Sequence, residues 1–202
     1  MTTSPSRLEG VCWFPHLPDP LVGCWYLDEH WDHDLHQRTG IGQLLYRAKT
    51  YEGKPGERSA ADALGELMQV GAQIVRDKRQ FPLRQVTLVV PVPAYPPKHP
   101  HNLPDVLAHH VGQSLGIECD QRLILKDLAT LPAKRSPSHQ VASDIREAFH
   151  VTRRLRGETI LLVDDLIHNG TTLGTLAGML VAAGAGRTGG FVASRARRGM
   201  TD

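Results

Sequence analysis

The stretch that decides the fold is TILLVDDLIHNGTTL, residues 159–173. Residues 159–163 form an apolar run, which is typical of a strand covered on both faces in a parallel sheet. Two acids and a glycine turn follow, and apolar residues then recur at helical spacing, at positions 173, 176, 177 and 180. The stretch therefore predicts a strand, a tight turn and a helix in that order.

The turn has the composition of an anion-binding site. Residues Asn169, Gly170, Thr171 and Thr172 would bring free backbone N–H groups and two hydroxyls to the positive end of a helix. Gly170 permits a positive φ and would let a phosphate approach the backbone. Asp164 and Asp165, as acceptors without donors, suit the vicinal hydroxyls of a ribose and, indirectly, a bound magnesium ion. The alternative is that the two acids only end a strand and cap a helix.

The surrounding sequence repeats this alternation of strand and helix. Strands are predicted over residues 22–27, 86–92, 122–126 and 188–194, and helices over 41–51, from Ser59 onward and after a cap at Asn102. Residues 127–143 show no clear period and predict a long, mobile loop. We expect an α/β domain over residues 22–202 with a mainly parallel sheet, preceded by an extended arm, residues 1–21. Ligands of such sheets bind at the carboxyl edge of the strands.

Composition limits the function classes. The chain has 202 residues and a net charge of +2, so bulk charge gives no case for nucleic acid or an anionic membrane. The three cysteines form no CxxC pair, and no stretch reaches the apolar length of a membrane span. Neither a P-loop nor a GxGxxG fingerprint is present. A reduced, cytoplasmic protein is the expectation.

The stretch TILLVDDLIHNGTTL resembles the PRPP-binding motif of type I phosphoribosyltransferases, where PRPP is phosphoribosyl diphosphate. Both contain an apolar run, two acids, two apolar residues and a Thr/Gly turn, in that order. The sequence VPVP at residues 90–93, followed by a polar loop, resembles the pyrophosphate loop of the ComF (competence protein F) family within that superfamily. Lys49-Thr-Tyr51 and Ala148-Phe149 also stand in the order that the ComF family shows. The resemblance in motif order therefore extends from about Val22 to Arg198. The chain differs from that family in lacking its zinc ribbon, in having only Lys98, His99 and His101 after VPVP, and in carrying His168.

The resemblance implies a fold, an activity and a set of site residues. It implies the type I phosphoribosyltransferase fold with a mobile hood loop, and transfer of the phosphoribosyl group between pyrophosphate and an unidentified, nucleobase-like acceptor, with magnesium bound alongside PRPP. The implied roles are ribose binding by Asp164 and Asp165, 5′-phosphate binding by Asn169, Gly170, Thr171 and Thr172, pyrophosphate binding by Val92, Pro93 and Ala94, proton transfer by His168, and charge stabilisation by Lys134 or Arg135 in the hood.

Several alternatives stay open at this point. His168 could be a locally hydrogen-bonded loop residue, and Lys134 and Arg135 could simply be solvated. The chain could be a non-catalytic PRPP or nucleotide sensor, or a ComF-like DNA-uptake factor, although single-strand binding normally needs a basic groove with exposed aromatics. A homodimer is as compatible with the sequence as a monomer.

One further cluster invites a metal hypothesis. His30, His33 and His36 recur every three residues with carboxylates between them, so two or three could face one zinc or manganese ion on a helix. Structural zinc sites usually need four well-spaced ligands, which favours a solvated loop or helix start instead.

Overall fold

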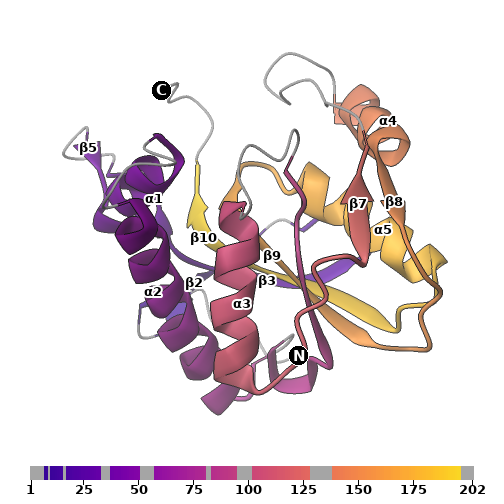
Figure 1. Ribbon diagram of the computed structural model, residues 1–202, viewed down its shortest axis with the longest axis horizontal. Helices are drawn as coiled ribbons and strands as arrows, with labels where there is room; N and C mark the ends of the chain where they lie inside the picture. Colours follow the sequence, from indigo (N-terminus) through magenta and orange to yellow (C-terminus); the bar gives the residue numbers. More distant parts are fainter. Residues whose placement is uncertain are drawn as a thin grey trace.

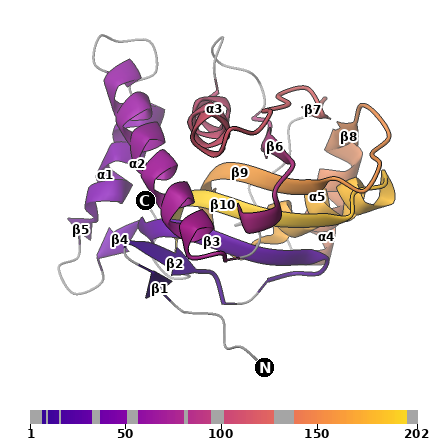
Figure 2. The same cartoon turned by 90° about the horizontal axis from the view of Figure 1, so that it is seen from below.

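The computed structural model describes residues 7–8, 10–15, 17–32, 37–50, 57–80, 83–94, 102–127 and 138–196. Its centre is a six-stranded sheet with helices packed on both faces (Figures 1 and 2). The strands are β1 (Arg7–Leu8), β2 (Val11–Trp13), β3 (Leu21–Glu29), β4 (Trp31–Asp32), β5 (Gln37–Arg38), β6 (Leu88–Pro91), β7 (Ile124–Lys126), β8 (Phe149–Val151), β9 (Thr159–Ile167) and β10 (Arg187–Arg195). The helices are α1 (Gly40–Thr50), α2 (Glu57–Asp77), α3 (Leu103–Leu115), α4 (Ser138–Ala148) and α5 (Thr171–Ala182), with a 3-10 turn η1 (Leu83–Gln85).

The strand order of the central sheet is β1-β2-β3-β10-β9-β6. The four strands β3, β10, β9 and β6 are mutually parallel, whereas β1 and β2 are antiparallel to their neighbours. The carboxyl ends of the four parallel strands therefore meet at one edge of the sheet. The predicted α/β class with a mainly parallel sheet is confirmed.

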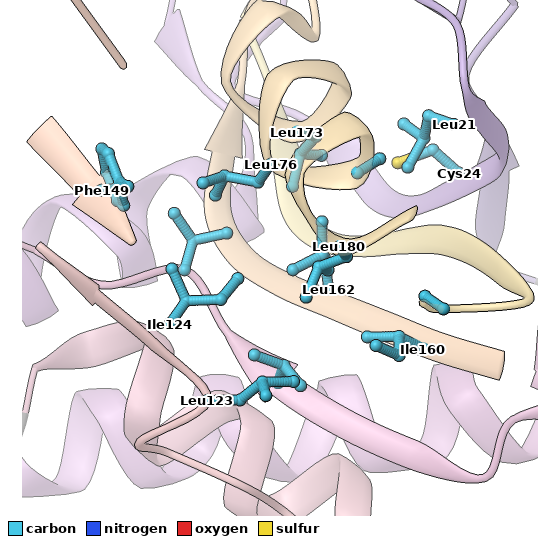
Figure 3. Close-up of a cluster of buried hydrophobic side chains, with 14 of the residues drawn as sticks. Leu21, Cys24, Leu123, Ile124, Phe149, Ile160, Leu162, Leu173, Leu176 and Leu180 are labelled. Carbon is cyan, nitrogen blue, oxygen red and sulfur yellow. The ribbon is translucent and has the colours of Figure 1, made fainter. Parts of the chain in front are cut away.

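Strand β9 shows why its sequence is apolar throughout. Its Ile160 and Leu162 pack into the core that contains α5, while Leu161 and Val163 pack into the core that contains α2 and α3. Figure 3 shows the first of these cores, where Leu173, Leu176 and Leu180 of α5 meet the strand. Helices α1, α2 and α3 lie together over the opposite face (Figure 2). The predicted buried face of α5 is confirmed.

The region predicted as a loop over residues 127–143 is helical from Ser138 onward, so the prediction was wrong for residues 138–143. Residues 128–137 of this predicted loop lie outside the described residues. Helix α4 begins at Ser138 and is followed by β8, which pairs with β7 in a separate two-stranded sheet. The helix went unnoticed because, among residues 142–148, its core contacts come mainly from Ile145 and Ala148, too few to give a clear period. Strand β7 likewise joins β8 rather than the central sheet.

Part of the segment expected to form an extended arm, residues 1–21, belongs to the central sheet. Strand β2 pairs with β3 through Cys12 and Trp13, and the Val11 side chain is fully buried under α2. Further along the chain, Pro18 lies against Gly170 and Gly174 at the start of α5. Within the described ranges, none of the helices is both long and apolar enough to cross a membrane.

Candidate functional site

The carboxyl end of β6 brings the predicted pyrophosphate loop beside the acid pair. Strand β6 pairs with β9 as far as Pro91 and Val163, and the Val92 N–H donates to the Val163 carbonyl at 2.8 Å. Val92 is buried, Pro93 is half-buried and Ala94 is exposed, so the chain leaves the sheet at this point. Residues 92–94 therefore begin next to Asp164, although about 70 positions separate them in sequence.

The two acids lie within β9 and face opposite sides of the sheet. Side chains alternate along a strand, so Asp164 continues the row of Leu162 and Asp165 continues the row of Val163. On the second side, Asp165 Oδ1 lies 2.8 Å from Lys49 Nζ of α1. The Asp165 N–H donates to Asp164 Oδ1 at 2.8 Å, which ties the two residues together.

Burial controls the electrostatics of the pair. Loss of solvent, followed by the negative charge of Asp165, raises the pKa of Asp164 to about 8, against the hydrogen bond from Asp165 and the charges of Lys49 and Lys126. Burial also lowers the pKa of Lys126, which Asp164 partly offsets. The Lys126 ammonium lies 4.9 Å from the Phe149 ring centre. Asp164 is therefore inclined to keep its proton near neutral pH.

The turn after β9 has the predicted geometry. Gly170 adopts the left-handed conformation with φ of 78°, and α5 begins at Thr171. The Asn169 side-chain oxygen accepts a 3.1 Å hydrogen bond from the Thr171 N–H. The N–H groups of Thr172 and Leu173 belong to the first helical turn, where no carbonyl four residues earlier lies within the helix. His168 and Asn169 are exposed, and Thr171 and Thr172 are half-buried.

The space beside Gly170 is occupied by two side chains that precede β3. A Cβ at this position would stand 3.1 Å from Pro18 Cδ and 3.6 Å from Phe14 Cε1, so the missing side chain makes room for Phe14 and Pro18. Pro18 also lies against Gly174, one turn along α5. The positive φ predicted for Gly170 is confirmed, and the approach of a phosphate to its backbone stays a prediction.

A second polar cluster lies at the same edge and was not found from the sequence. Arg195, at the end of β10, lies 3.6 Å from Glu29 Oε1, and the Tyr26 hydroxyl donates to that oxygen at 3.0 Å. The Arg195 guanidinium also lies 5.1 Å from the Phe14 ring centre. Burial is the main cause that raises the pKa of Tyr26 to about 12. The Phe14 ring also lies close to the Cβ position of Gly170, so it connects this cluster with the start of α5.

The remaining predicted residues are placed as follows. His30 is buried, with its ring centre 6.1 Å from that of Trp31. The predicted site residues Lys134 and Arg135, together with His33, His36, Lys98, His99 and His101, lie outside the described residues. In the part of the chain that is described, no group of three or more His, Cys, Asp or Glu side chains is arranged to hold a metal ion.

Comparison with known proteins finds matches among solved structures. No protein-family model and no curated protein matches the sequence. Among solved structures, the crystal structure of adenine phosphoribosyltransferase from Leishmania tarentolae matches 86% of this chain and 91% of its own, with 10% identical residues and a TM-score of 0.42. A match with this TM-score and this identity shows neither a family nor an activity for this chain.

Proposed function

We propose that this chain binds PRPP and transfers its phosphoribosyl group, as a member of the type I phosphoribosyltransferase superfamily. The observation that carries the proposal is the meeting of three elements at one sheet edge. These are the end of β6 at Val92, the acid pair on β9, and a left-handed glycine that starts α5. A sugar that carries a phosphate at one end and a diphosphate at the other fits this arrangement, because the acids lie between two sources of backbone donors.

Each part of the ligand has a partner under this proposal. The 5′-phosphate would bind at the start of α5, through backbone N–H groups and the hydroxyls of Thr171 and Thr172. The ribose hydroxyls would donate to the acids. On the diphosphate side, the Val92 N–H is already bonded to Val163 and Pro93 has no N–H. Of the three residues in that loop, Ala94 is therefore the one that would donate from its backbone.

The proposed reaction breaks the bond between ribose C1 and the diphosphate oxygen, and the electron pair leaves with the diphosphate. A nucleobase-like acceptor nitrogen then bonds to C1, and its proton is lost. His168 is exposed directly after β9, and it would take that proton, because a neutral imidazole is a suitable base near neutral pH. Lys134 or Arg135 would stabilise charge on the departing diphosphate.

Magnesium would enter this site with the diphosphate. The ion prefers oxygen ligands and usually binds through substrate phosphates with one or two carboxylates, so the phosphate oxygens and acids fit it without a protein cage. When bound, it would neutralise charge on the diphosphate. The chain's own residues would hold the two ends of the ligand.

Thermal melting with matched ligands tests the binding step. Ribose 5-phosphate, and PRPP with magnesium, should raise the melting temperature at millimolar concentration, since a ligand that binds only the folded state stabilises it. Ribose without phosphate is the control and should have little effect. Equal melting with ribose and ribose 5-phosphate would reject the phosphate site. Release of pyrophosphate from PRPP that depends on an added nucleobase would then establish transfer, whereas binding without release would indicate a sensor.

A further inference from the structure

The loops that enter the parallel strands are rich in exposed arginine. They lie at the amino ends of β6, β9 and β10, whereas Asp164 of the candidate site is five residues along β9, about 17 Å from its start. We call residues 77–80, 84–87, 116–122, 152–158 and 183–187 the amino edge. Its exposed basic residues are Lys78, Arg79, Arg84, Arg122, Arg153, Arg154, Arg156 and Arg187, and its acids are Asp77, Glu118, Asp120 and Glu158.

Short contacts join the loops of the amino edge into one surface. The Leu155 N–H donates to the Ala183 carbonyl at 2.8 Å, which holds the loop before β9 against the loop before β10. A Cβ at Gly184 would collide with the Leu155 carbonyl oxygen, so the two backbones meet because this residue has no side chain. Arg187 Nη1 donates to Gln85 Oε1 at 3.3 Å and adds the loop before β6. The basic side chains therefore start from a backbone whose loops are held together.

Two acids of the amino edge already have partners within it. Arg153 Nη2 lies 3.2 Å from Asp120 Oδ2, and Arg153 Nη1 lies 3.5 Å from Glu158 Oε1. Asp120 also accepts from the Arg122 N–H at 3.0 Å, and Glu158 accepts from the Arg156 N–H. Among the residues that the structure describes, no ion pair is made by the side chains of Arg79, Arg84, Arg122, Arg154 and Arg156. The edge thus presents five cations to an external anion.

Basic residues beyond a helix can have a purely structural role, because they interact favourably with the negative end of the helix dipole. Lys78 and Arg79 fit this explanation, since α2 ends at Asp77. Arg154 and Arg156 do not, because they lie between strands β8 and β9 and follow no helix. These two arginines are therefore the best evidence for a partner.

We propose that the amino edge binds the phosphate backbone of a nucleic acid duplex. Guanidinium groups present planar sets of donors that match phosphate oxygens in pairs. The described residues of this edge include no aromatic side chain on which an unpaired base could stack, which favours paired strands over single ones. The net charge of +2 conceals this surface, because it is a sum over the whole chain.

This inference goes beyond the proposed function and does not depend on it. The amino edge and the acid pair lie at opposite ends of β9, further apart than the distance of about 10 Å over which exposed charges interact at 0.1 M salt. Substitutions at one of the two places should therefore leave binding at the other unchanged.

Fluorescence anisotropy of a labelled DNA duplex measures the binding. The full chain is titrated into a duplex of about 20 base pairs, about 68 Å of helix, at salt concentrations from about 50 to 200 mM. Contacts from two to five arginines should give a slope of log K against log salt concentration between about −2 and −4.5, because each contact releases counterions. Absence of binding at about 50 mM salt, or binding that does not change with salt, would overturn the proposal.

Two double variants test the arginines themselves. Arg154→Gln with Arg156→Gln removes two cations and leaves the ion pairs of Arg153 in place. The affinity at about 50 mM salt should fall at least about tenfold, and the salt slope should become shallower by about 2. Arg154→Lys with Arg156→Lys keeps the charge and should keep the wild-type slope, since lysine also binds phosphate. Equal losses in the glutamine and lysine variants would mean that charge is not what binds, against the proposal.

The matched control is Arg47→Gln with Arg146→Gln. It lowers the net charge by the same amount, through two exposed arginines of α1 and α4 that lie outside the amino edge. This control should bind the duplex as the wild type does, and a loss as large as that of Arg154→Gln with Arg156→Gln would reject the amino edge as the binding surface. Circular dichroism establishes that each variant is folded, and Arg84→Gln with Arg122→Gln carries the test should the first variant be unfolded.

Competition experiments separate the duplex from other anions. Unlabelled DNA duplex and RNA duplex should both displace the probe, because both offer paired backbone phosphates. The single strand of the same sequence, and polyglutamate at equal charge, should displace it less well. Stronger competition by the single strand would reject a duplex as the ligand, and stronger competition by polyglutamate would indicate an acidic protein segment instead.

The two proposals fail separately in these measurements. Ribose 5-phosphate should raise the melting temperature of Arg154→Gln with Arg156→Gln as much as that of the wild type. If ribose 5-phosphate stabilises neither protein, the proposed function fails and the duplex titration still decides the role of the amino edge. If the wild type binds ribose 5-phosphate and no duplex, the proposed function stands and the amino edge has no nucleic acid partner.

Discussion

Pro18 lies against the glycine that starts helix α5, at a distance of 3.1 Å from the place where a Cβ of Gly170 would stand. The contact links a residue that precedes the first parallel strand to the turn that we propose as a phosphate site. It means that the shape of this turn depends on β9 and α5 and also on Phe14 and Pro18. Two properties of Gly170 are therefore needed together, its left-handed backbone and its missing side chain.

Gly170→Ala should lower the free energy of unfolding by about 2–4 kcal/mol, from the cost of a left-handed non-glycine residue plus crowding against Pro18. Urea denaturation measures it. Gly116→Ala is the matched control, since Gly116 has φ of 65° with open space around its Cβ position. The control should show the conformational cost alone, and Pro18→Ala should recover part of the loss in the Gly170→Ala background. Equal losses at the two glycines would show that Pro18 does not restrict the turn.

Thr172→Val should weaken ribose 5-phosphate and PRPP equally, by about 1.5–3 kcal/mol, because it removes one hydroxyl donor to a charged oxygen and keeps the side-chain shape. Calorimetric titration measures both affinities. Pyrophosphate alone should bind as before, since its proposed site is at residues 92–94. A variant that lost pyrophosphate and kept ribose 5-phosphate would reverse the assignment of the two anion sites.

The double substitution Asp164→Asn with Asp165→Asn should abolish binding of ribose 5-phosphate and leave the fold intact. An amide can still accept a hydrogen bond, but it has no charge, and the ion pair between Lys49 and Asp165 is lost. The fold should survive because a partly exposed ion pair contributes little to stability. Asp77→Asn, at the exposed end of α2, is the control for a simple loss of charge. Wild-type binding by the double mutant would reject the acid pair as the ribose site.

The pH dependence of stability should report Asp164. Its pKa is raised in the folded state, so the folded protein retains a proton that the unfolded chain releases above about pH 4. The contribution of this group to stability therefore falls as pH rises from about 4 toward 8 and is constant above that range. The Asn side chain of Asp164→Asn cannot ionise. The free energy of unfolding of this variant should therefore rise relative to that of the wild type as pH increases from about 4 to 8.

Urea unfolding at pH 4, 6 and 8 measures this difference. A gain of about 1 kcal/mol corresponds to a rise of about 2–4 °C in melting temperature for a chain of this size. Parallel stability curves for the wild type and Asp164→Asn across this range would mean that Asp164 ionises normally in the folded protein.

The parts of the fold that were predicted from sequence are those that depend on neighbours in the chain. The strand, turn and helix around Gly170 each have a local cause in period, composition or backbone freedom. The parts that were missed depend on distant partners. Arg195 meets Tyr26 across 169 positions, and the short strand β8 has a partner in β7 rather than in the main sheet. No local pattern identifies such pairs, and the same holds for Lys49 and Asp165.

The place of β10 in the sheet has a consequence for how the protein is made. This strand is the last one in the part of the chain that the structure describes, yet it lies between β3 and β9, which do not pair with each other (Figure 1). Until residue 195 leaves the ribosome, β3 and β9 each keep an edge with unsatisfied backbone groups, and such edges readily pair with other chains. The nascent polypeptide thus depends on β10 to join two open half-sheets, and a chaperone would have most exposed edge to protect in the interval before β10 emerges.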